Sequence, residues 1–320
     1  MIGIVDIQDK IKHIDRWQQK RRAISFIYAL FKKYGDDSGG YQAALLTYYT
    51  FLSLFPLMLV LVTVLHIWFK NDPELQQQVS TSVAHFFPML GNQLQSNVHS
   101  LKGAGVGLIV GAVITLYGAR GAADAFRYTI DNMWQIPKNK RAGFPRSLLH
   151  SVAILGAAFG GFAATLAVSI FTSDLGHATW VKIVANVVGF VTLTCVLGYA
   201  FRIATLRRLR LRYMLLGAVT AAALMQLLLS FGSIIVTHEL HKLDTLYGTF
   251  ALVLGMLFWI YLLAQVVLLS AEIDTVRHFG LWPRTLSGKL QTDADRTAYA
   301  LYVQTDKYTA NETIRTKFKR

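Results

Sequence analysis

The sequence predicts an all-α, polytopic membrane protein with six transmembrane helices. It also predicts an amphipathic helix at the N-terminus and two amphipathic helices between spans 1 and 2. Three observations support this class. Long uncharged runs recur along most of the 320 residues, only 16% of residues are charged, and the mean hydropathy is +0.40. An ordinary soluble domain has about 25% charged residues, and a helix needs about 20 mostly apolar residues to cross a bilayer. A soluble enzyme is therefore not expected.

Residues 1–40 are predicted to form a basic, amphipathic cytoplasmic arm. Ile7, Ile11, Ile14 and Trp17 recur at helical spacing, and lysines and arginines lie around the other faces. Such a helix can lie on an anionic membrane surface. A solvated or core-packing helix is the alternative. The arm has no apolar core followed by a cleavage site, so the first span is expected to act as the targeting signal.

The transmembrane domain is predicted to occupy residues 41–276. Its six spans are expected at about residues 43–69, 105–129, 147–172, 181–201, 213–237 and 247–271. Pro56 lies inside the first span and removes one backbone hydrogen bond, which predicts a kink or break there. The kink could serve as a gate, or it could be a bend without function. Residues 277–320 are predicted to be a charged cytoplasmic tail, partly disordered.

The basic residues predict the orientation of the chain. Of its 32 lysines and arginines, 28 lie in the arm, the 2–3 and 4–5 connections and the tail, when Arg120 and Arg127 near the end of the second span are counted with the 2–3 connection. This is the positive-inside pattern, which predicts cytoplasmic termini and a bacterial inner (plasma) membrane location. The same distribution explains most of the net charge of +14. It indicates anionic headgroups of membrane lipids as partners, and nucleic acid is not expected.

The second span ends in a face of alternating charge. Its members are Arg120, Asp124, Arg127 and Asp131. Side chains at this spacing are neighbours on a helix. Arg120 could be a snorkelling residue that marks the end of the span, or it could belong to a cationic site at the inner end of a cavity. Glu272 ends the sixth span at a similar depth, so we hypothesise a salt bridge from Glu272 to Arg120 or Arg127.

Three blocks of the spans read, in order, YQAALLTYYTFLSLFPLMLVL, GVGLIVGAVITLYGARGAADAFRYTIDNMW and YGTFALVLGMLFWIYLLAQVVLLSAEIDTV. Together they resemble the YihY/BrkB family of bacterial inner-membrane proteins, historically labelled ribonuclease BN, over roughly residues 23–278. Where that family commonly has Gly-Ala-Glu near the end of the sixth span, this chain has Ser270-Ala271-Glu272. The resemblance implies a six-helix integral membrane protein linked to the cell envelope and to lipid or lipopolysaccharide export.

Few residues of this chain suggest catalysis. The single cysteine excludes an intrachain disulfide and a cysteine-based metal site. His238 and His241 lie in a predicted outer loop at a spacing that does not match a zinc-binding motif. No cofactor or metal is therefore expected, and the protein is not expected to be an enzyme. We expect transport or flipping of an anionic lipid or related amphiphile. A non-transporting scaffold for envelope assembly, with oligomeric or assembly partners, is one alternative, and a ribonuclease is another.

Overall fold

The computed structural model describes residues 13–68, 105–141, 143–173, 179–205, 210–247, 249–286 and 292–318. These residues form helices joined by turns, and no strand occurs among them. The prediction of an all-α fold is therefore confirmed. The two amphipathic helices predicted between the first and second spans lie outside the described residues.

Six long helices occur within the described ranges. They are α3 (Gly39–Trp68), α6 (Gly105–Met133), α7 (Arg146–Ser173), α8 (Thr179–Ala204), α9 (Leu215–Tyr247) and α10 (Thr249–Phe279). Stretches of α6, α8, α9 and α10 are long and apolar enough to cross a membrane. Helices α3 and α7 are 30 and 28 residues long, but the side chains of their distal halves are not described. The count of six spans stays a prediction for these two.

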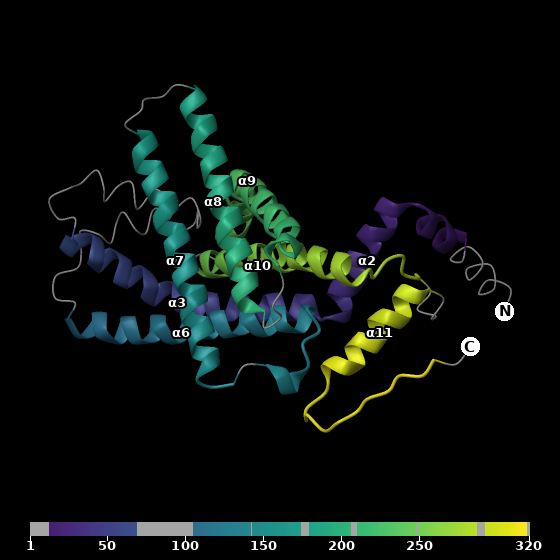
Figure 1. Ribbon diagram of the computed structural model, residues 1–320. Coiled ribbons are helices and arrows are strands. Elements are labelled where there is room, and N and C mark those ends of the chain that lie inside the picture. The colour runs from purple at the N-terminus through teal and green to yellow at the C-terminus, as the bar shows by residue number, and fades with distance from the viewer. Residues whose placement is uncertain are drawn as a thin grey trace.

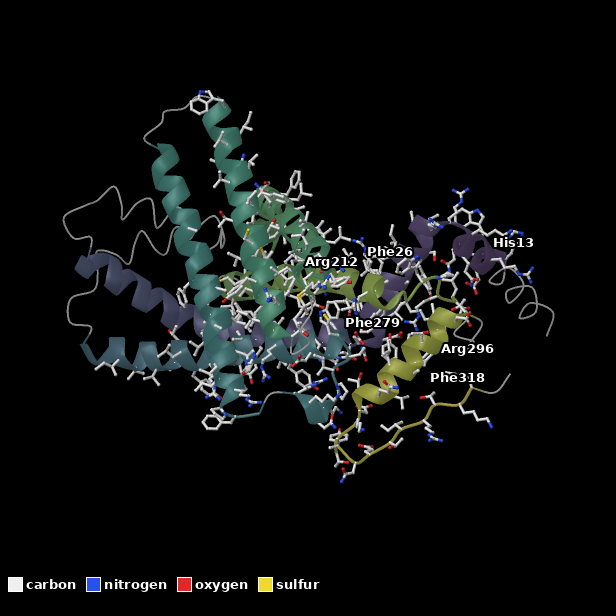
Figure 2. All side chains as sticks on the ribbon, in the orientation of Figure 1. His13, Phe26, Arg212, Phe279, Arg296 and Phe318 are labelled. Carbon is white, nitrogen blue, oxygen red and sulfur yellow. The ribbon has the colours of Figure 1, made fainter. Side chains whose placement is uncertain are left out.

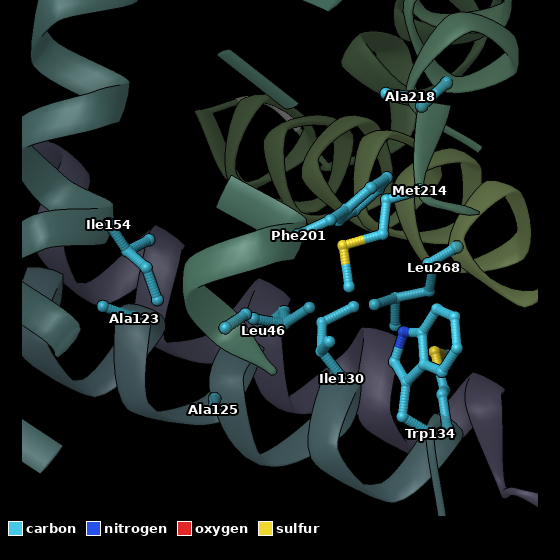
Figure 3. Packing of buried hydrophobic residues seen from close by; sticks show 14 of the residues in the cluster. Leu46, Ala123, Ala125, Ile130, Trp134, Ile154, Phe201, Met214, Ala218 and Leu268 are labelled. Carbon is cyan, nitrogen blue, oxygen red and sulfur yellow. The ribbon is translucent and has the colours of Figure 1, made fainter. Parts of the chain in front are cut away.

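The long helices pack as neighbours along the chain, with α3 beside α6, α7 beside α8 and α9 beside α10. Figure 1 shows the α7–α8 pair projecting away from the α3–α6 pair. The main hydrophobic cluster lies where these pairs meet. Figure 3 shows Leu46, Trp134, Phe201, Met214 and Leu268 converging there from five different helices or their ends. The described core thus gathers at one end of the bundle, where α3, α7 and α9 begin and α6, α8 and α10 end.

This end, called here the basic end, carries several exposed basic side chains. They are Lys140, Arg146, Arg202, Arg210 and Arg212. Helices α3 and α6 approach each other closely, which supports the packing of the bundle. A Cβ atom at Gly118 of α6 would lie 2.8 Å from the Cβ atom of Ser53 in α3. Small residues at such contacts let two membrane helices approach closely.

Two further helices lie against the basic end, α2 (Arg22–Asp36) and α11 (Asp293–Thr305). Thr292 caps α11 by accepting a hydrogen bond from the Asp295 amide. Ala298 of α11 packs with Ala29 and Leu30 of α2 and with Val276 of α10. This part of the tail is folded against the arm and the bundle, whereas the expectation of a charged, partly disordered tail stays a prediction for its other residues. In α11 the buried residues alternate with charged residues over a short stretch of sequence, so the apolar pattern that would predict packing of this helix is weak.

Two local expectations need correction. Residues 238–241 belong to helix α9 and not to a loop. No glycine or proline occurs between Gly232 and Gly248, so nothing in the sequence ends the helix earlier. Helix α3 is continuous from Gly39 to Trp68, which corrects the expectation of a break at Pro56, whereas the expected kink there stays a prediction.

Candidate functional site

The charged face of α6 forms a connected group of side chains. Arg120 Nε lies 3.6 Å from Asp124 Oδ2, and Arg127 Nη2 lies 3.7 Å from Asp124 Oδ1. Asp124 also accepts a hydrogen bond of 2.6 Å from Ser151 Oγ in α7. The Arg120 side chain is 52% exposed, whereas that of Arg127 is 12% exposed. Asp124 thus joins two arginines to the neighbouring helix, and Arg120 keeps an accessible guanidinium.

Aromatic residues help to place Arg120 along the helix. The Arg141 guanidinium lies 4.6 Å from the centre of the Tyr128 ring, and that of Arg212 lies 4.9 Å from the Tyr213 ring. Aromatic and basic side chains gather at membrane interfaces. Arg120 precedes Tyr128 by eight residues, so it lies about 12 Å further along α6, away from the basic end. Inside a membrane an arginine requires a counter-charge or water, and Asp124 lies in place to supply a counter-charge for Arg120.

Glu272 does not pair with Arg120 or Arg127 as hypothesised. Its Oε2 atom lies 3.1 Å from Lys33 Nζ, and both side chains are fully buried. The reason is tertiary, because α2 folds back against the end of α10 and brings its own lysine to the carboxylate. Sequence reasoning assigned Lys33 only to the basic arm, so it did not consider this partner.

Lys33 is the centre of a buried polar group, called here the Lys33 cluster. Its ammonium contacts Asp37 and Glu272 and donates a hydrogen bond of 3.0 Å to the Met133 carbonyl. Three more hydrogen bonds complete the cluster: Gln135 Nε2 to Asp37 Oδ1 at 2.9 Å, Thr305 Oγ1 to Gln135 Oε1 at 2.5 Å, and Thr275 Oγ1 to Glu272 Oε2 at 2.5 Å. The cluster therefore connects α2, the end of α6, α10 and α11.

Electrostatics keep Lys33 charged in this buried place. Burial alone would lower the pKa of its ammonium, but the nearby carboxylates of Asp37 and Glu272 outweigh burial and raise that pKa. Burial raises the pKa of the adjacent Tyr34 phenol to about 12, so this group stays neutral at physiological pH. The one sequence signal for the cluster was the four-residue spacing of Lys33 and Asp37, which predicts a pair but not its burial.

A second buried group, called here the Arg284 cluster, joins the arm to the tail. Arg284 is fully buried, with Nη1 2.8 Å from Asp36 Oδ2 and Nε 3.0 Å from Asp295 Oδ1. Asp15 accepts a hydrogen bond of 2.7 Å from Thr285 Oγ1. Nearby, Phe26, labelled in Figure 2, packs edge-on against Trp282.

Asp295 and Asp15 of the Arg284 cluster are held in their charged form. Burial tends to raise the pKa of Asp295, but hydrogen bonds from Thr292, Arg284 and the Thr285 amide outweigh it and lower that pKa. Burial acts in the same direction on Asp15, and hydrogen bonds led by that of Thr285 lower its pKa as well. Sequence reasoning did not find this junction, because its members come from the two ends of the chain.

A search among protein families matches residues 30–281 to the family described as "Virulence factor BrkB". The chain belongs to the BrkB family. This confirms the resemblance seen in the three sequence blocks. The described residues of this BrkB-family protein contain no group of three or more His, Cys, Asp and Glu side chains that could hold a metal ion.

Relatives of this BrkB-family protein are named as membrane proteins. A UPF0761 membrane protein of Stenotrophomonas maltophilia is 28% identical over 281 residues, covering 82% of this chain and 63% of the relative. A UPF0761 membrane protein of Alcanivorax borkumensis is 24% identical, and the match covers 78% of this chain and 59% of the relative. One of Vibrio vulnificus is also 24% identical, and the match covers 80% of this chain and 83% of the relative. The chain thus spans less than two thirds of the first two relatives. No solved structure matches significantly. With its apolar helices, the chain is a multi-pass integral membrane protein.

Proposed function

We propose that this BrkB-family protein moves an anionic lipid, or a related amphiphile, across the membrane, and that Arg120 and Arg127 contact the headgroup. The observation that carries the proposal is the half-exposed guanidinium of Arg120, which lies about 12 Å from the aromatic residues of the basic end. Charges at such depth usually face a protein interior or a water-filled cavity and mark substrate pathways. A phosphate headgroup could replace Asp124 as the partner of Arg120.

We further infer that the basic end faces the cytoplasm of a bacterial inner membrane. Support comes from the placement of 28 of the 32 basic residues and from the exposed arginines around this end. In this orientation Arg120 is reached from the inner leaflet. The headgroup would then move along the charged face of α6, past Arg127 and Arg120.

Helix α3 supports a gating role in this proposal. It packs against the part of α6 that carries Arg120, where Gly118 and Gly121 lie against Ser53 and Tyr49 of α3. A movement of the distal part of α3 about Pro56 would change the surroundings of Arg120. Proline removes one backbone hydrogen bond and so lowers the cost of such bending.

The test is lipid translocation in vesicles that contain the purified protein. Fluorescent anionic and zwitterionic lipids are compared by quenching of the outer leaflet. We expect faster movement of the anionic lipid, and Arg120→Ala should slow it. The matched control is Arg202→Ala, which removes an exposed arginine at the end of α8. Equal rates for protein-free and protein-containing vesicles would contradict the proposal, and an unchanged rate in Arg120→Ala would remove this residue from the mechanism.

A non-transporting scaffold is the second candidate, and the arm supplies the observation that favours it. Ile14, Trp17, Ile27 and Phe31 are each about half exposed, which leaves an apolar surface on the arm for a partner or a membrane. If scaffolding is the function, the double variant Ile27→Ser, Phe31→Ser should abolish envelope function in cells, whereas Arg120→Ala should not. The reverse result would favour transport.

A further inference from the structure

The Lys33 cluster contains two carboxyl groups and one ammonium without solvent contact. The Lys33 and Glu272 side chains are 0% exposed, and Asp37 is 3% exposed. An ammonium has three N–H donors. Lys33 donates hydrogen bonds to Asp37 and to the Met133 carbonyl, and it forms an ion pair with Glu272, whose Oε2 atom lies 3.1 Å from Nζ.

Glu272 is left incompletely bonded in this arrangement. Its Oε1 atom is buried and has no hydrogen-bond partner among the residues that the structure describes. With both carboxyls ionised, the three charged groups would carry one net negative charge. A buried net charge that is not compensated is costly, and a group in that position usually takes up a proton instead.

We propose that the Lys33 cluster binds one exchangeable proton, held on the carboxyl group of Glu272. This carboxyl and that of Asp37 form a pair around one ammonium, with Glu272 Oε2 3.1 Å from Lys33 Nζ. A second negative charge beside a single buried ammonium is not compensated, and the unpartnered Oε1 atom of Glu272 offers the place for the proton. The bound proton leaves the cluster neutral overall, and it supplies the hydrogen that two acceptor-only carboxylates lack.

The other groups around the pair favour a proton over a metal cation. The titratable groups that act on the pair are Lys33 from α2 and, through Asp37, Tyr302 from α11. Tyr34 of α2 is also close enough to Glu272 and to Tyr261 of α10 for electrostatic interaction. The end of α6 contributes an amide, Gln135, and the Met133 carbonyl. The central position is thus taken by an ammonium, whose positive charge would repel a metal ion.

Proton release would loosen the basic end. The cluster joins four elements, so its net charge bears on the contacts of α2 and α11 with α10 at once. When the proton is present, the cluster is neutral and these elements stay packed. When it leaves, admitting water to the charged cluster requires α2 and α11 to separate from α10. This inference does not rest on the lipid substrate proposed above, because it concerns a separate group of residues.

Infrared difference spectroscopy between acidic and alkaline buffers tests the proton directly. We expect a carboxylic-acid carbonyl band in the wild type that is lost on alkalisation and is absent in Glu272→Gln. The control Asp274→Asn removes another buried carboxyl of α10, on the side of Gly217, and should keep the band. A wild-type spectrum with no band that depends on Glu272 would overturn the proposal.

Thiol labelling tests the loosening. In a Cys195→Ser background, Ala298→Cys places a single buried thiol on α11, and Val303→Cys places an exposed one on the same helix. We expect the labelling rate at position 298, divided by that at 303, to rise by up to about tenfold per pH unit over the range in which opening releases the proton. With Glu272→Gln added, whose amide mimics the protonated acid, the ratio should stay low and constant. A ratio that follows the sodium concentration and not pH would overturn the proposal.

Discussion

Replacement of Arg284 by methionine is expected to release the tail from the arm. The Arg284 side chain is 0% exposed, and it binds Asp36 at 2.8 Å and Asp295 at 3.0 Å. Removing one partner of a buried ion pair costs about 3–5 kcal/mol, because the other charge stays buried without compensation. At about 1.4 kcal/mol per factor of ten, the population with α11 undocked should rise between about a hundredfold and a few thousandfold.

Hydrogen–deuterium exchange of the α11 amides measures this population in the full-length protein. The control is Arg296→Met, because the Arg296 side chain is 46% exposed and its contact with Asp293 is 3.8 Å long. Such a surface pair contributes about 0–1 kcal/mol, so exchange should change by less than about fivefold. The double variant Arg284→Met, Asp295→Asn should recover part of the protection by removing one uncompensated charge. If α11 exchanges equally in Arg284→Met and Arg296→Met, then Arg284 does not hold the tail.

Three further predictions follow from buried groups. Folding lowers the pKa of Asp15 and Asp295. Their contribution to tail docking is therefore present above their unfolded pKa values near 4 and is lost as pH falls below those values. The rate of proteolysis of the tail, measured as pH is lowered, follows this loss of docking. Gly217→Ala should cost about 1–3 kcal/mol, because its Cβ would overlap a carboxylate of α10, whereas Gly156→Ala meets open space and should not destabilise; thermal unfolding compares them. Lys33→Met should cost about 3–5 kcal/mol, and adding a neutral glutamine at position 272 should recover part of this in the same assay.

The helices could be predicted from the sequence because their signal is local. A run of apolar residues long enough to cross a membrane fixes its own boundaries. The first span is predicted at 43–69, and helix α3 runs from 39 to 68; the third is predicted at 147–172, and helix α7 runs from 146 to 173. Helix α9 continues ten residues beyond the predicted end of the fifth span, to Tyr247, although hydropathy falls before that point. Helix formation continues through polar residues where no glycine or proline stops it.

The partners of the charged residues could not be predicted in the same way. Spacing along one helix correctly brought Asp124 between Arg120 and Arg127, because these contacts lie within a single element. The partner of Glu272 comes from α2, and no local pattern shows that α2 returns to the end of α10. The hypothesis that Glu272 pairs with an arginine of α6 rested only on the similar predicted depth of these residues. Burial of a lysine is also unexpected from sequence, since lysine is rarely buried unless paired.

Exposure separates the arginine that fixes the fold from the one that can bind a ligand. Arg284 has the carboxylates of Asp36 at 2.8 Å and Asp295 at 3.0 Å, and it has no solvent contact. Replacement of either carboxylate by a ligand would leave that carboxylate as an uncompensated charge. Arg120 has Asp124 at 3.6 Å and a side chain that is 52% exposed. The Arg120–Asp124 pair is long and accessible, so it contributes little to stability and can open at small cost. An incoming phosphate can therefore compete with Asp124 for Arg120, whereas it cannot compete with Asp36 or Asp295 for Arg284. A headgroup site is thus expected on α6 and not among the buried charges of the basic end.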